Sequence, residues 1–208
     1  MLTIWGRKNS SNVKKVLWCA EELEIPFDQV DAGGAFGVVD SDDYRSKNPN
    51  GLIPCIEDDG FVLWESNAIV RYLVARYGDQ STLLPPTLED RASADRWMDW
   101  CSTTLAAPFT VMIQQLVRTP EAERDMAKIN AATRQFADAL HIAESGLASN
   151  QWFSGPSFGI GDIPLGVLIN TWYAMPSIER PVLPAIEAWH RRLKLRPAFK
   201  QWVAIPLT

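Results

Sequence analysis

Four residues in the first third of the chain have the types and the spacing to hold a small peptide-like anion: Ile53, Pro54, Glu65 and Ser66. Pro54 has no N–H to give to a strand ladder, so a bend is expected there. A cis Ile53-Pro54 bond would turn the N–H and C=O of Ile53 outward, where they could pair with the backbone of a ligand. Ser66 is placed to cap a helix over 67–77, whose positive end would hold a carboxylate together with the hydroxyl. This arrangement predicts that the chain holds a short peptide by its backbone and its α-carboxylate.

The same residues also allow a purely structural interpretation. Pro54 could only end a strand, Ser66 could only cap a helix, and Glu65 could only be an acidic residue in a first turn. For Pro54 and Ser66 the structural role is expected in any case, and contact with a ligand would add to it.

Hydrophobic spacing predicts an α/β unit followed by a helical one. Strands are expected at 2–5, at 27–31 and on both sides of an acidic turn at 58–60, helices at 13–23 and 67–77, and one short helix within 38–50. The first unit ends near Gly78, and the turn-prone stretch 79–86 is expected to be a linker. Beyond it, helical patterns cover 88–107, 120–147, 164–175 and 184–195. The predicted fold class is therefore α/β + all-α, with domains at 1–78 and 87–208.

Composition excludes several classes of protein. The chain has 208 residues, of which 47% are hydrophobic and 22% charged, values typical of globular enzymes. A net charge of −5 without any Lys/Arg cluster argues against a nucleic-acid partner. No apolar run reaches membrane-spanning length, and the N-terminus leads directly into a strand, so neither a membrane nor a signal peptide is expected.

The cysteines and histidines indicate neither a disulfide framework nor a metal site. The three cysteines, Cys19, Cys55 and Cys101, are odd in number, widely spaced and without a CxxC pair, which favours a reducing cytoplasm. The two histidines, His141 and His190, are too few and too far apart for a metal cluster. We therefore expect a cytoplasmic protein that needs no metal.

The order and spacing of Ile53-Pro54 and Glu65-Ser66, together with the α/β unit followed by a helical one, resemble the soluble glutathione transferases. The resemblance is to the bacterial-like members with a serine or asparagine site. The resemblance covers the whole chain and implies a thioredoxin-like N-terminal domain followed by a C-terminal helical-bundle domain. In that family the residue before a cis-proline pairs with the cysteinyl backbone of glutathione, and an acidic-Ser pair holds the γ-glutamyl amino and carboxylate groups. The resemblance places these roles on Ile53, Pro54, Glu65 and Ser66. It also implies a homodimeric detoxification enzyme with glutathione as co-substrate.

Glutathione chemistry needs a thiolate, which directs attention to the polar turn before the first helix. A free thiol has a pKa of about 8.5, and lowering it by about two units needs roughly 2.7 kcal/mol. One hydrogen-bond donor to the charged sulfur contributes about 1.5–3 kcal/mol, so no general base is required. The resemblance places the donor on Ser10 and a second polar donor on Asn12, with Ser11 as the fallback if the turn differs by one residue. Alternatively, the run 9–12 only caps the helix.

Two further parts of the site are implied by the resemblance. Many relatives carry a Lys or Gln that helps to hold the glycyl carboxylate of glutathione where this chain has Leu52. Here that carboxylate would be held by Lys14 or by the loop near Phe36, or would be left in solvent. Lys14 itself is expected to be an ordinary exposed helix residue. The family builds an apolar pocket for the second substrate between its domains. The residues placed there are Trp100, Thr103, Thr104, Phe109 and Met112.

A structural motif is also expected in the helical half. Gly159 stands where the family places a helix cap, and Asp162 three residues later is expected to accept a hydrogen bond from the Gly159 N–H. This motif would start a core helix over 160–175 and has no role in chemistry.

Two other functions are compatible with the same fold. One is a glutathione-dependent disulfide reductase or dehalogenase, which would form a mixed disulfide or release halide. The other is a non-catalytic glutathione transferase-like binding module, which would not bind glutathione at millimolar concentration. The intact peptide-holding residues argue against the binding module, and we expect a transferase that acts on a small apolar electrophile.

Overall fold

The computed structural model describes residues 1–79 and 81–207. Main-chain contacts divide the chain into two compact units, Met1–Leu84 with Pro197–Ile205, and Pro85–Arg196 with Pro206–Thr208. The division between Leu84 and Pro85 falls inside the stretch expected to be a linker. Residues 197–205, which the sequence analysis assigned to the helical domain, cluster instead with the first unit.

The first unit contains a four-stranded mixed sheet of strand order β2-β1-β3-β4. Strand β1 runs parallel to β2, with Ile4 opposite Gln29, and antiparallel to β3, with Ile4 opposite Ile56. The turn between β3 and β4 has positive φ at Asp59 and Gly60, as a tight hairpin requires. The strands are β1 (Leu2–Trp5), β2 (Phe27–Val30), β3 (Cys55–Asp58) and β4 (Phe61–Trp64).

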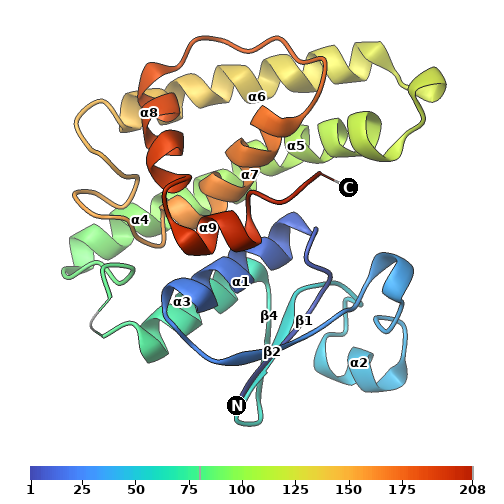
Figure 1. Ribbon diagram of the computed structural model, residues 1–208, viewed down its shortest axis with the longest axis vertical. Helices are drawn as coiled ribbons and strands as arrows, with labels where there is room; N and C mark the ends of the chain where they lie inside the picture. The colour runs from blue at the N-terminus through green and yellow to red at the C-terminus, as the bar shows by residue number, and fades with distance from the viewer. Residues whose placement is uncertain (80, 208) are drawn as a thin grey trace. The chain divides into compact units, whose positions relative to one another are not determined.

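Helices cover the sheet of the first unit because its strands place apolar side chains on both faces. Figure 1 shows α1 and α3 on one side of the sheet and α2 on the other. The order of strands and helices agrees with the predicted thioredoxin-like unit. The helical elements are α1 (Ser11–Glu22), η1 (Gly34–Phe36), α2 (Asp42–Lys47), α3 (Ser66–Tyr77) and, from the end of the chain, α9 (Pro197–Trp202).

The C-terminal helix α9 belongs to the first unit because it packs on α1. The ring of Phe199 meets the fully buried Trp18 edge to face, with centroids 5.0 Å apart. The Trp202 indole donates to the Glu21 carboxylate at 3.1 Å. Sequence analysis ended its helical patterns at 195 and did not predict this helix.

The second unit consists of helices, and its first one is longer than predicted. Helix α4 (Leu88–Trp100) continues through a π-helical stretch η2 (Cys101–Leu105) into α5 (Ala106–Ile113) and a second π-helical stretch η3 (Gln114–Arg118). Pro108 has no N–H for the Thr104 carbonyl, and a wider turn accommodates its ring, which accounts for η2.

The remaining helices of the second unit begin at local capping groups. Helix α6 starts behind the Asp125 side chain, which accepts from the Lys128 N–H at 3.1 Å, and not at Pro120 as expected. Helices α5 and α6 run side by side (Figure 1). These elements are η4 (Glu121–Glu123), α6 (Met126–Gly146), α7 (Asp162–Ala174) and α8 (Pro184–Leu193).

Asp162 joins two of these helices from a fully buried position. Its carboxylate accepts from the Gly159 N–H at 3.1 Å, which confirms the predicted bond, and from the Trp189 indole of α8 at 2.8 Å. Helix α7 itself begins at Asp162 with Gly161 as its N-cap, so the expected start at 160 was wrong. Burial raises the pKa of the Asp162 carboxyl.

Within the part of the chain that the structure describes, no helix combines the length and the apolar character needed to cross a membrane.

Candidate functional site

The Ile53-Pro54 peptide bond is cis, as the family resemblance implied. Among the described residues, no hydrogen bond reaches the N–H or C=O of Ile53. The preceding carbonyl, that of Leu52, is held firmly: the Tyr44 hydroxyl and the Asn48 side-chain amide each donate to it at 2.7 Å. Two fixed side chains therefore set the path of the chain into the cis bond and leave the main-chain groups of Ile53 available to a ligand.

Glu65 and Ser66 join β4 to α3 in an arrangement that differs from the prediction. Glu65 is the N-cap residue, with φ +72° and ψ 110°, and Ser66 is the first residue of the helix. The expectation that Ser66 is the N-cap was wrong, because the backbone at Glu65 leaves the strand one residue earlier. A positive φ at a residue with a Cβ is sparsely populated and is a common mark of a functional position.

A polar cluster lies where the first turns of α1 and α3 meet. The Lys15 ammonium donates to Asn12 Oδ1 at 3.0 Å and contacts Ser66 Oγ at 3.4 Å. Ser66 Oγ and Asn12 Oδ1 are also 3.4 Å apart. Lys15 and Ser66 are buried, with 5% and 6% of their surfaces exposed, while Asn12 is exposed. The cluster therefore joins the N-terminal ends of two helices, both of which favour negative charge.

A small pocket of about 60 Å³ gathers these groups. It contains all four residues predicted to bind the ligand and one of the three predicted to act on it, Asn12. Its lining also includes residues that sequence reasoning did not single out for ligand contact, Asn48, Asn50 and Trp64. The full lining is Asn12, Asn48, Asn50, Leu52, Ile53, Pro54, Trp64, Glu65 and Ser66.

Ser10 and Ser11 are not among the residues lining this pocket. Ser10 is the N-cap of α1, half-buried, and its side chain makes no capping hydrogen bond. Ser11 is the first residue of the helix and is also half-buried. Capping therefore does not occupy the Ser10 hydroxyl. The roles of both serines in catalysis stay predictions.

Lys14 is buried, which contradicts the expectation of an exposed helix residue. Its side chain is 3% exposed, and its ammonium donates to the Val203 carbonyl, just beyond α9, at 3.2 Å. Burial lowers the pKa of Lys14 to about 8. Leu52 and Phe36, the other residues considered near the glycyl end, are exposed. Lys14 therefore stabilises the fold of the first unit, and it does not line the pocket.

The five residues predicted for the second substrate all lie on the first long helix of the second unit. Trp100 ends α4 and packs edge to face on Trp97, with centroids 5.4 Å apart. Phe109 and Met112 are buried, and Phe109 packs against Phe136 of α6. The others are Thr103, which is exposed, and Thr104, which is half-buried. Contact of these residues with a substrate stays a prediction.

The three cysteines are buried, and none of them is in a disulfide within the described part of the chain. Burial raises the pKa of Cys55, beside the cis-proline, to about 11, and it raises the pKa of Cys19 still further. A thiol with a raised pKa is a poor nucleophile at neutral pH. Cys19 and Cys55 are therefore packing residues.

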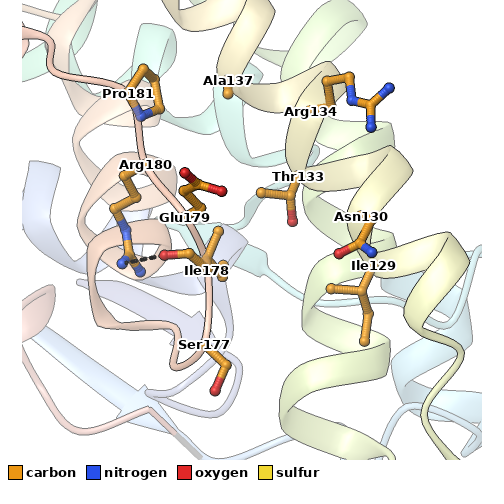
Figure 2. Close-up of a pocket in the computed structure, with 10 residues that line it drawn as sticks. All are labelled: Ile129, Asn130, Thr133, Arg134, Ala137, Ser177, Ile178, Glu179, Arg180 and Pro181. Carbon is orange, nitrogen blue, oxygen red and sulfur yellow. Dashed lines mark hydrogen bonds between the residues drawn. The ribbon is translucent and has the colours of Figure 1, made fainter.

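A larger hollow of about 520 Å³ lies in the second unit and contains none of the predicted residues. Figure 2 shows α6 contributing one wall and the segment after α7 the other. Of its two arginines, Arg134 and Arg180, the second donates to the carbonyls of Trp172, Met175 and Ile178, and so binds the C-terminal end of α7. The charge of Arg180 therefore stabilises the end of α7.

Comparison with known proteins adds independent information. The family model for the glutathione S-transferase N-terminal domain matches residues 1–75. Glutathione S-transferase GstB of Escherichia coli (strain K12) is 42% identical, with both chains fully covered. Glutathione S-transferase 3 of Zea mays is 30% identical, over 99% of this chain and 95% of its own.

Among solved structures, a theta class glutathione S-transferase from the citrus canker pathogen Xanthomonas axonopodis pv. citri, with glutathione bound, has a TM-score of 0.95 and 51% identity. The match covers 100% of this chain and 99% of that one.

Proposed function

This chain belongs to the glutathione S-transferase family, and we propose that the pocket beside the cis Ile53-Pro54 bond is where it binds glutathione. As a transferase it joins the sulfur of glutathione to an electrophile. The observation that carries the proposal is that main-chain groups of Ile53 without internal partners open into the same pocket as Ser66, the first residue of α3. A peptide backbone can pair with the first, and a carboxylate can bind at the second.

Each end of the peptide has a distinct partner in this proposal. The cysteinyl backbone pairs with Ile53, and Pro54 holds that backbone open. The γ-glutamyl carboxylate binds at the N-terminal end of α3, where it accepts from the Ser66 hydroxyl and main-chain amides. Glu65 takes the α-amino group. At this end the carboxylate of the peptide meets the positive end of α3, and its amino group meets the Glu65 carboxylate. These two pairs fix the direction of the bound peptide.

Calorimetry with glutathione tests this assignment. Ser66→Ala is expected to weaken binding by about 1–3 kcal/mol, because the carboxylate loses a donor. Ser46→Ala is the matched control, since Ser46 is an exposed serine of α2 that donates only to the Asp43 carbonyl. Equal affinities for the two folded variants would show that glutathione binds elsewhere.

For the thiolate, we propose Ser10 as a donor to the sulfur with Asn12 assisting. Support for Ser10 is its hydroxyl at the start of α1, which no cap occupies, and support for Asn12 is its place in the pocket lining. Titration of the bound thiol by its ultraviolet absorbance separates the two. Ser10→Ala should raise the apparent pKa by about one to two units, each unit being about 1.4 kcal/mol. A larger shift in Asn12→Ala would make Asn12 the main donor, and a shift in neither would refute both.

The electrophile is proposed to be small and apolar, and the role to be detoxification in the cytoplasm. A panel of aryl halides, epoxides and mixed disulfides tests the first point. Turnover of mixed disulfides alone would reassign the chain as a reductase.

We also propose a homodimer. The first unit exposes apolar side chains on and beside its edge strand β4, among them Phe61 at 47% and Tyr77 at 38%. Side chains of this kind commonly lie in protein interfaces. Sedimentation equilibrium at micromolar concentration should give twice the chain mass, and a monomeric mass would refute the proposal.

A further inference from the structure

Lys15 is a buried cation that lies behind the proposed glutathione pocket without lining it. It stands on the second turn of α1, with 5% of its surface exposed. Its ammonium reaches two residues that do line the pocket, Asn12 and Ser66, at 3.0 and 3.4 Å. Burying an ammonium is costly unless its surroundings supply acceptors. Because burial of the Lys15 ammonium is costly, we ask what its contacts with Asn12 and Ser66 contribute to the pocket.

The chemistry of the ammonium determines which way the Asn12 amide faces. A lysine ammonium has three donors and no acceptor, so the atom it meets must be the carbonyl oxygen of the amide and not its nitrogen. The Ser66 hydroxyl lies within 3.4 Å of the same oxygen. With Oδ1 directed at the Lys15 ammonium, the two N–H donors of Asn12 are turned away from the cluster.

We propose that Lys15 is a positioning residue, which holds the Asn12 amide so that its N–H donors are presented to the sulfur of bound glutathione. This inference rests on the proposed function of the pocket. Without the ammonium, the amide is free to rotate by half a turn. In that orientation its oxygen, which repels a thiolate, would replace the donors. Lys15 also orders the Ser66 hydroxyl, so one cation connects the sulfur end and the carboxylate end of the site.

The neighbouring residue provides a matched control. Lys14 is buried to a similar degree on the same helix, but its ammonium donates to the Val203 carbonyl and it does not line the pocket. Lys14→Met and Lys15→Met therefore remove the same charge from adjacent positions, one directed away from the pocket residues and one directed at them.

The test combines single and double variants of the full chain, with glutathione as the probe. The apparent pKa of the bound thiol is measured for wild type, Lys15→Met, Asn12→Ala and the double variant. Lys15→Met should lower the thiolate fraction at neutral pH about as much as Asn12→Ala does, roughly tenfold for one pKa unit. The double variant should add nothing to Asn12→Ala, because both changes remove the same oriented donor. Lys14→Met should titrate like wild type.

Several outcomes would overturn the inference. Additive shifts, or a shift in Lys15→Met with none in Asn12→Ala, would mean that Lys15 does not act through the amide. An unchanged titration in Lys15→Met would mean that it does not act at all. If Lys15→Met does not fold, Lys15→Gln is measured by the same criteria, and Lys15→Arg, which keeps only donors, should retain the wild-type titration. Failure of the wild type itself to bind glutathione would refute the proposed function and this inference with it.

Discussion

The backbone at Glu65 predicts a conflict between binding and stability at one residue. With φ +72° and ψ 110°, Glu65 occupies a region that costs about 1–3 kcal/mol for a residue with a Cβ. Its side chain is exposed and lines the pocket, so no packing requires a glutamate there. Alanine at this position removes the carboxylate and keeps the strain. Glycine removes both.

The magnitude follows from comparing these two variants. Glycine recovers the strain of about 1–3 kcal/mol and loses about 0.5–1 kcal/mol through the entropy of its unfolded chain. Glu65→Gly should therefore be more stable than Glu65→Ala by about 1 kcal/mol, near the middle of a range of about 0–2.5 kcal/mol. Urea unfolding followed by circular dichroism measures the difference, with equal slopes required for a valid comparison. Glutathione affinity should fall in both variants, since each lacks the carboxylate.

A second pair of variants at Glu89 serves as the control. Glu89 is exposed in the first turn of α4, where the backbone is helical. There glycine should be less stable than alanine by about 1 kcal/mol, the reverse of the order at Glu65. If Glu89 behaves in this way and Glu65→Gly is no more stable than Glu65→Ala, the argument from backbone strain is refuted.

Three further predictions concern stability and are measured by urea unfolding. Gly6→Ala should cost at least about 2 kcal/mol, because the new Cβ would lie 2.4 Å from Cγ2 of Val13 at a residue with φ +152°; a neutral result would mean that α1 moves freely. Burial lowers the pKa of His190 to about 4, so between pH 6.5 and 4 the unfolded state binds more protons than the folded state. The free energy of unfolding therefore decreases as the pH is lowered through this range, by about 3 kcal/mol in total. His190→Gln should lose less over that range, and a parallel pH profile would exclude His190 as the cause. Asp162→Ala should cost more than about 3 kcal/mol, since buried donors that include the Trp189 indole lose their acceptor; a loss below 1 kcal/mol would refute its role in joining the helices.

The sequence predicted those features of the fold that are determined by residues close together along the chain. Alternating and helical periods identified the strands and α-helices of residues 1–78 in their correct order but missed α9, and the family resemblance implied the cis bond at Pro54. The start of α3 was placed one residue late because the positive φ of Glu65 depends on how β4 meets the helix. That geometry has no signature in a glutamate side chain.

The burial of Lys14 and Lys15 could not be predicted for a different reason. The apolar residues of α1 recur on one helical face. The two lysines lie outside that face, and their position in the helix predicts that they are exposed to solvent. The structure covers Lys14 with the end of the chain and Lys15 with the start of α3. Both partners are distant in sequence, so the spacing within α1 carries no information about them.

The position of α9 has a consequence for the order in which the chain folds. Because residues 197–205 belong with the first unit, that unit cannot be completed until residue 205 has been synthesised. Domains generally fold in the order in which they leave the ribosome, but here the main segment of the second unit, Pro85–Arg196, is synthesised before the first unit can be completed. During that interval Trp18 lacks the ring of Phe199, and Lys14 lacks the carbonyl of Val203. A chain that stops before Pro197 would therefore keep the main segment of its helical unit, Pro85–Arg196, and lose the packing behind the helix that carries Asn12 and Lys15.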